Sequence, residues 1–62
     1  MSFRAFALRA RLERARTLLD ETTMPIGQIA RALGYEDVFL FSRQFKQQYG
    51  YSPRKIRRPD RQ

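Results

Sequence analysis

The stretch of sequence that decides the fold runs from Pro25 to Tyr49 and reads PIGQIARALGYEDVFLFSRQFKQQY. Residues 25–33 place apolar side chains on one helical face, and the leading proline suits a first helical turn, where no backbone donor is lost. Gly34 follows directly, which predicts a helix end with positive φ. Residues 38–49 then predict a second helix. The stretch therefore predicts a helix-turn-helix unit.

The spacing over 38–49 divides the second helix into two faces. Phe41, Phe45 and Tyr49 recur every four residues and form its inner face. Asp37 stands directly before the helix and is the predicted N-cap. The outer face is left to polar side chains, namely Ser42, Arg43, Lys46 and Gln47. The inner face is complete without both Phe39 and Leu40. Phe39 could equally cover the core or contact a partner.

A longer helix is predicted before this unit, over about residues 3–20. This segment contains no proline or glycine, and Ser2 is the only available N-cap. Its apolar residues are spaced three and four apart, which predicts one buried stripe made of Ala5, Leu8, Leu12, Ala15 and Leu19.

A short helical turn is predicted after the unit, over about 53–57, because Ser52 and Pro53 form a cap followed by a first-turn proline. Residues 58–62 are expected to fray. The predicted fold is therefore all-α: a small three-helix helix-turn-helix domain of homeodomain-like architecture with a short fourth helical turn. A chain of 62 residues is expected to form a single domain over 1–62.

The composition narrows the possible functions. The chain has no cysteine and no histidine, which excludes disulfides, thiolate chemistry, zinc fingers and histidine catalysis. Eleven arginines and two lysines against six acids give a net charge of +7. Such an excess favours a polyanionic partner, and arginine is the better forked ligand for phosphates and guanine edges.

Other classes of protein fit the sequence poorly. No apolar run approaches the roughly 18 residues needed to span a bilayer, and arginines interrupt the first 16 residues where a signal peptide would lie. The acids Asp20-Glu21 and Glu36-Asp37 form adjacent pairs at predicted helix ends, and no nucleophile has a base beside it. We therefore expect no enzyme activity, no cofactor and no metal site.

The chain resembles the AraC family of bacterial transcription regulators over nearly its whole length. The matching motifs are Arg11-Leu12-x-x-Ala15, Pro25-Ile26-x-x-Ile29-Ala30, Leu33-Gly34-Tyr35-x-Asp37, Phe41-Ser42-Arg43-x-Phe45-Lys46 and Gly50-x-Ser52-Pro53. Members of that family carry two helix-turn-helix units joined by a linker helix. This chain resembles the linker helix plus the second unit, without the first unit or an effector domain. An excised segment, a truncated gene and a small protein that acts alone all fit.

The resemblance implies sequence-specific DNA binding in transcription regulation, with the helix over 38–49 in the major groove. It places Val38, Phe39, Leu40 and Arg43 at the positions that reach base edges. Relatives often carry polar or aromatic groups where Val38 and Leu40 stand. Apolar side chains cannot hydrogen-bond a base edge, although they can touch a thymine methyl. We therefore expect weak direct readout with Arg43 as the main polar contact.

Phosphate contacts are expected from both helices of the unit and from the segment after it. The candidates are Arg31, Ser42, Lys46, Gln47 and Arg54. A basic cluster at Arg54, Lys55, Arg57 and Arg58 adds non-specific attraction or remains solvated. For Arg43, a solvated side chain or an internal brace to Glu36 or Asp37 is the alternative to a base contact.

Two other functions remain as alternatives. A protein-interaction module that binds RNA polymerase or a full-length regulator would use the apolar patch Val38-Phe39-Leu40. A membrane-active basic peptide would be built on residues 3–19, but it leaves the glycine turn and the later helices without a purpose. The expected location is the bacterial cytoplasm, at the nucleoid when bound to DNA.

Overall fold

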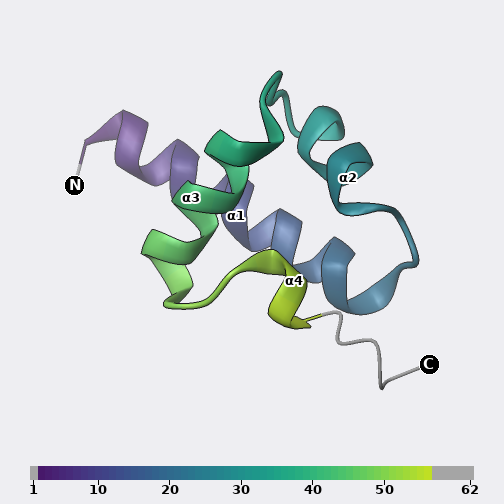
Figure 1. Ribbon diagram of the computed structural model, residues 1–62. Helices are drawn as coiled ribbons and strands as arrows, with labels where there is room; N and C mark the ends of the chain where they lie inside the picture. The colour runs from purple at the N-terminus through teal and green to yellow at the C-terminus, as the bar shows by residue number, and fades with distance from the viewer. Residues whose placement is uncertain (1, 57–62) are drawn as a thin grey trace.

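Four helices make up the structure, a computed structural model that describes residues 2–56 (Figure 1). They are α1 (Phe3–Glu21), α2 (Ile26–Ala32), α3 (Val38–Tyr49) and α4 (Pro53–Ile56). No strand occurs within residues 2–56, so the predicted all-α class is confirmed. The predicted end of the last helix at residue 57, the fraying of 58–62 and the Arg57–Arg58 part of the basic cluster lie outside the described residues.

The long first helix begins and ends with side-chain caps. The Ser2 hydroxyl accepts a hydrogen bond from the Ala5 amide at 3.1 Å. At the other end the backbone becomes extended at Thr22, whose hydroxyl donates to the Leu18 carbonyl at 2.6 Å. Thr22 thus closes the helix one residue later than the sequence predicted.

The buried seam of α1 is shorter than the predicted stripe. Leu12, Ala15 and Leu19 are buried and Leu8 is half-buried, but Ala5 is exposed. The expectation that Ala5 is buried is wrong, because the first turns of α1 project past the other helices (Figure 1). Helical spacing identifies a face but not how far a neighbour extends along it.

The turn between α2 and α3 is set by Gly34, whose φ is +97°. The Tyr35 amide donates to the Ala30 carbonyl at 2.9 Å, and the Gly34 amide donates to the Arg31 carbonyl at 3.0 Å. These two bonds form a Schellman motif, and the buried Tyr35 ring follows it as its apolar contact. The prediction of a positive φ at Gly34 is confirmed.

The third helix is fixed at both ends and along its inner face. The Asp37 carboxylate accepts a hydrogen bond from the Phe39 amide at 2.8 Å, which confirms the predicted N-cap. Gly50 ends the helix with φ +86°. Phe41 and Phe45 are 0% exposed, which confirms the inner face.

Aromatic rings fill the space between α3 and the other helices. Phe45 lies in the middle, with ring centroids 5.9 Å from Phe41, 4.7 Å from Tyr49 and 6.1 Å from Tyr51. The Tyr51 ring and the buried Pro53 were not expected in the core, and both bring the segment after α3 back onto it. The helix α1 contacts each of the other three helices, so its seam closes the core from one side.

Candidate DNA-binding surface

The outer face of α3 presents a ridge of exposed side chains. Phe39, Arg43 and Lys46 follow one another at steps of four and three residues, and all three are exposed. Side chains at these steps are neighbours on a helix surface. Gln47 is also exposed beside the ridge, as the sequence predicted for this face.

The three apolar residues expected at base edges are not equivalent. Phe39 is 75% exposed, so its ring is not a cap over the core. Leu40 is 39% exposed at the flank of the ridge. Val38 is half-buried and packs against the core cluster. The structure therefore leaves Phe39 as the most accessible apolar side chain of α3.

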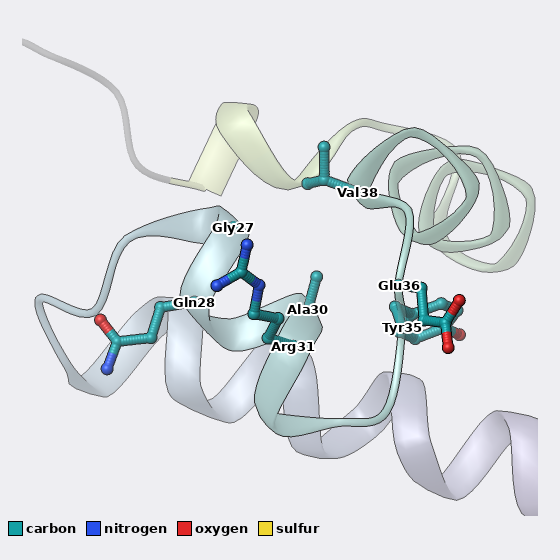
Figure 2. Close-up of a pocket in the computed structure, with 7 residues that line it drawn as sticks. All are labelled: Gly27, Gln28, Ala30, Arg31, Tyr35, Glu36 and Val38. Atoms are coloured by element: carbon teal, nitrogen blue, oxygen red, sulfur yellow. The ribbon is translucent and has the colours of Figure 1, made fainter.

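A hollow opens between α2 and the first turn of α3. It is lined by Gly27, Gln28, Ala30, Arg31, Tyr35, Glu36 and Val38. Figure 2 shows the Arg31 side chain extending into this gap, with Val38 opposite it at the start of α3 and Gln28 pointing away. The Arg31 guanidinium is thus exposed on α2, beside the first turn of α3.

A second hollow joins the starts of α2, α3 and α4. Its lining residues are Ile26, Gly27, Val38, Phe39, Ser42, Ser52, Pro53 and Arg54. The two hollows share Gly27 and Val38, so they adjoin at the first turn of α3, with Arg31 lining one and Arg54 the other. Ser42 is half-buried and lines the second hollow.

Arg43 does not brace the start of its own helix. It is exposed, and no ion pair joins it to Glu36 or Asp37 in the part of the chain that the structure describes. The Asp37 carboxylate is engaged with the Phe39 amide instead. The guanidinium of Arg43 is therefore available to a partner.

Two arginines of α1 have a different role, which the sequence did not reveal. The Arg11 guanidinium lies 5.3 Å from the centroid of the Tyr35 ring, and that of Arg16 lies 5.1 Å from the centroid of Tyr49. The Tyr35 hydroxyl in turn donates to Oε1 of Gln44. These contacts tie α1 to the turn and to α3, and so fix the orientation of the exposed ridge.

Among the described residues, Tyr49 is the group whose pKa the fold shifts. Burial raises the pKa of Tyr49 above its usual value, and the nearby Glu13 carboxylate raises it further. The Arg16 guanidinium acts in the opposite direction. The Tyr49 ring thus packs α3 against α1, and its hydroxyl stays protonated.

Two further properties bear on the type of site. Within residues 2–56, no group of three or more metal-ligating side chains gathers in one place. The described helices also include none that is long and apolar enough to cross a membrane. What the described surface offers is a ridge of cationic and apolar side chains flanked by two arginine-lined hollows.

Comparison with known proteins agrees with this geometry. The family model described as "Helix-turn-helix domain" matches residues 1–59. The C-terminal domain of the two-component response regulator yesN from Fusobacterium nucleatum superposes with a TM-score of 0.88 at 34% identity, covering 94% of this chain and 56% of that one. The chain is thus a helix-turn-helix protein.

Curated relatives are transcription regulators by name. The "Msm operon regulatory protein" of Streptococcus mutans is 33% identical over 58 residues, which is 94% of this chain and 21% of that protein. The "Arabinose operon regulatory protein" of Escherichia coli is 43% identical over 47 residues, covering 76% of this chain and 16% of that protein. The chain spans about a fifth of the length of these relatives.

These matches identify the family. The chain belongs to the AraC-type helix-turn-helix family of transcription regulators, as the motifs predicted. Regulators of this family bind DNA and are not typically enzymes.

Proposed function

We propose that α3 enters the major groove of double-stranded DNA with the ridge Phe39–Arg43–Lys46 facing the bases. The observation that carries this proposal is the division of α3 itself: Phe41 and Phe45 are fully buried while the ridge on the opposite side is exposed. An α-helix with its side chains is about 10–12 Å across and the major groove is about 12 Å wide, so α3 can lie in the groove.

Base contacts are assigned to the start of α3. Recognition helices reach base edges with the residues of their first turns. In this chain Phe39, Leu40 and Arg43 occupy that region, and Val38 lines the hollows behind them. Arg43 supplies the forked donor that a guanine edge accepts.

Phosphate contacts are assigned to the cations and polar groups around the ridge. The residues proposed for this role are Arg31, Ser42, Lys46, Gln47 and Arg54. The two arginines line hollows that adjoin the first turn of α3, which supports contacts to the DNA backbone near the start of the inserted helix.

The wider setting follows from the same proposal. We infer that residues 1–62 form one domain without catalytic activity, which acts in the bacterial cytoplasm at the nucleoid. The chain corresponds to a linker helix and the second of two helix-turn-helix units. If the chain is a segment of a longer regulator, a first unit and an effector domain would lie in the remainder of that protein.

The proposal is tested by titrating the isotope-labelled chain with DNA duplexes while amide chemical shifts are followed. Random and candidate duplexes should shift the amides of α3 and the starts of α2 and α4. Shifts confined to the exposed side of α1 would contradict the assignment of α3.

The variant Arg43→Ala tests the main polar contact. We expect it to weaken binding by about 1–3 kcal/mol, because it removes the forked donor of the ridge. Fluorescence anisotropy with a labelled duplex measures the loss. The matched control is Arg14→Ala, which removes the same charge from the exposed side of α1. Equal affinities of the two variants would remove Arg43 from the proposed site.

One observation favours a second candidate function. Phe39 is a large, exposed apolar side chain, as a protein-binding patch requires. A module that binds RNA polymerase or a full-length regulator would retain its partner in a pull-down after nuclease treatment. Loss of the partner on nuclease treatment would leave DNA as the ligand.

A further inference from the structure

We propose that Phe39, with Leu40 at its flank, reads the C5-methyl group of pyrimidines in the major groove. The ligand chemistry is a methyl group on a base edge, supplied by thymine or by 5-methylcytosine. This inference rests on the proposed DNA-binding function and names the base feature that the ridge selects.

The position of Phe39 is fixed although its side chain is free. Its amide donates to the Asp37 carboxylate at 2.8 Å, so the first turn of α3 is held in place. Its ring is 75% exposed and takes no part in the aromatic core. A large apolar side chain that serves no packing purpose is thus presented at the end of the helix that enters the groove.

The surroundings of Phe39 favour DNA over an apolar protein surface. Arg43 lies one turn further along the same ridge, Lys46 follows it, and Arg54 lines the same hollow as Phe39. The neighbouring acid Asp37 is already engaged in the helix cap. A phenylalanine set among cations matches a polyanion that also exposes apolar groups.

The C5-methyl group is the apolar feature of the major groove. Adenine, guanine and cytosine present donors and acceptors there, whereas thymine adds a methyl group beside its acceptor. A phenyl ring pressed against a polar edge would remove water without supplying a hydrogen bond, and that is unfavourable. Against a methyl group the same contact buries apolar surface on both sides.

The ridge also predicts the spacing of the features read. Phe39 and Arg43 are four residues apart, which is about 6 Å along the helix axis. Base pairs rise about 3.4 Å along each strand. A methylated pyrimidine read by Phe39 should therefore lie within about two base pairs of the guanine read by Arg43.

The experiment begins with a binding site selected from random duplexes by the full chain. Each thymine of that site is then replaced by deoxyuridine, which removes only the methyl group. We expect a loss of about fourfold in affinity at the contacted position, the amount that burial of one methyl-sized group supplies. At that position, 5-methylcytosine should bind more tightly than cytosine by a similar factor.

Two variants complete the test. Phe39→Ala should abolish the affinity difference between thymine and deoxyuridine and that between 5-methylcytosine and cytosine. Circular dichroism should show an unchanged fold because the ring lies outside the core. Phe6→Ala is the matched control: Phe6 is 62% exposed on α1, and its removal should leave both differences intact.

The outcomes separate the inference from the function on which it rests. Equal affinity for thymine and deoxyuridine duplexes overturns methyl reading while DNA binding stands. Retention of the difference in Phe39→Ala likewise overturns the role of Phe39. Failure to bind any duplex removes the proposed function itself.

Discussion

At the scale of single residues, arginines have different roles according to the groups that they contact. Arg11 and Arg16 lie over the rings of Tyr35 and Tyr49 and hold α1 against α3. Arg43 is exposed with no such ring and stays available to DNA. A count of arginines therefore overstates the charge devoted to the binding surface, because part of it stabilises the packing.

Gly27 is a residue whose replacement should stabilise the fold. It lies within α2, and a Cβ added there would meet nothing within 4 Å. We expect Gly27→Ala to raise the free energy of unfolding by up to about 1 kcal/mol, because alanine loses less backbone entropy on folding. Urea unfolding measures the gain. Gly34→Ala is the contrast and should destabilise, since Gly34 adopts φ +97°.

Tyr49 should make the stability depend on alkaline pH. Its pKa is raised in the folded state, so the unfolded chain ionises first as the pH passes about 10. The folded state then binds more protons than the unfolded state, and the free energy of unfolding falls as the pH rises. Urea unfolding from about pH 8 to about pH 11 should show a smaller fall for Tyr49→Phe than for the unsubstituted chain. A constant difference between the two over that range would contradict the assignment.

At the scale of helices, the placement of α3 depends on its two ends as much as on its core. The Asp37 carboxylate begins the helix and Gly50 ends it. Between them, Gln44 accepts the hydroxyl hydrogen bond of Tyr35. The ridge is thus presented by a helix with little freedom to rotate about its axis.

The variant Asp37→Ala should weaken the start of α3. Removing an N-cap costs about 1 kcal/mol, because the amide of Phe39 loses its acceptor. A chain of this size should then melt about 4–8 °C lower. Asp37→Asn is the control, since asparagine is an equally good N-cap. Similar melting temperatures for the alanine and asparagine variants would argue against a stabilising cap.

The elements could be predicted because their signals are local. Pro25, Gly34 and Gly50 mark helix ends by their backbone conformation and Asp37 by its capping side chain, and the four-residue repeat of aromatic residues identified the core face of α3. The length of the buried seam on α1 could not be predicted in the same way. Whether Ala5 is covered depends on how far a neighbouring helix reaches.

The tertiary contacts of the site were harder to predict. The stacking of two arginines on tyrosines joins segments distant in sequence, and the packing of Tyr51 and Pro53 brings the segment after α3 back onto the core. No periodicity encodes these contacts. The candidate site was predicted to centre on α3 with Arg43 as its main polar contact, but its apolar residues could not be ranked. Only the folded chain separates the exposed Phe39 from the half-buried Val38.

At the scale of the whole molecule, the net charge of +7 governs how binding responds to salt. If about four phosphates are neutralised, the logarithm of the binding constant should fall against the logarithm of salt concentration with a slope of about −3.6. Anisotropy titrations over a range of salt concentrations measure it. Lys46→Ala should reduce the slope by about 1, and a slope near zero would mean that binding is not electrostatic.

The contact of α1 with all three other helices has a consequence for how the chain opens. The buried seam of α1 consists of Leu12, Ala15 and Leu19, and α2, α3 and α4 all pack against this helix. Within residues 2–56, the three shorter helices form no separate hydrophobic core without α1. We therefore expect all-or-none melting, in which the loss of α1 from the shared core unfolds α3 together with the other helices.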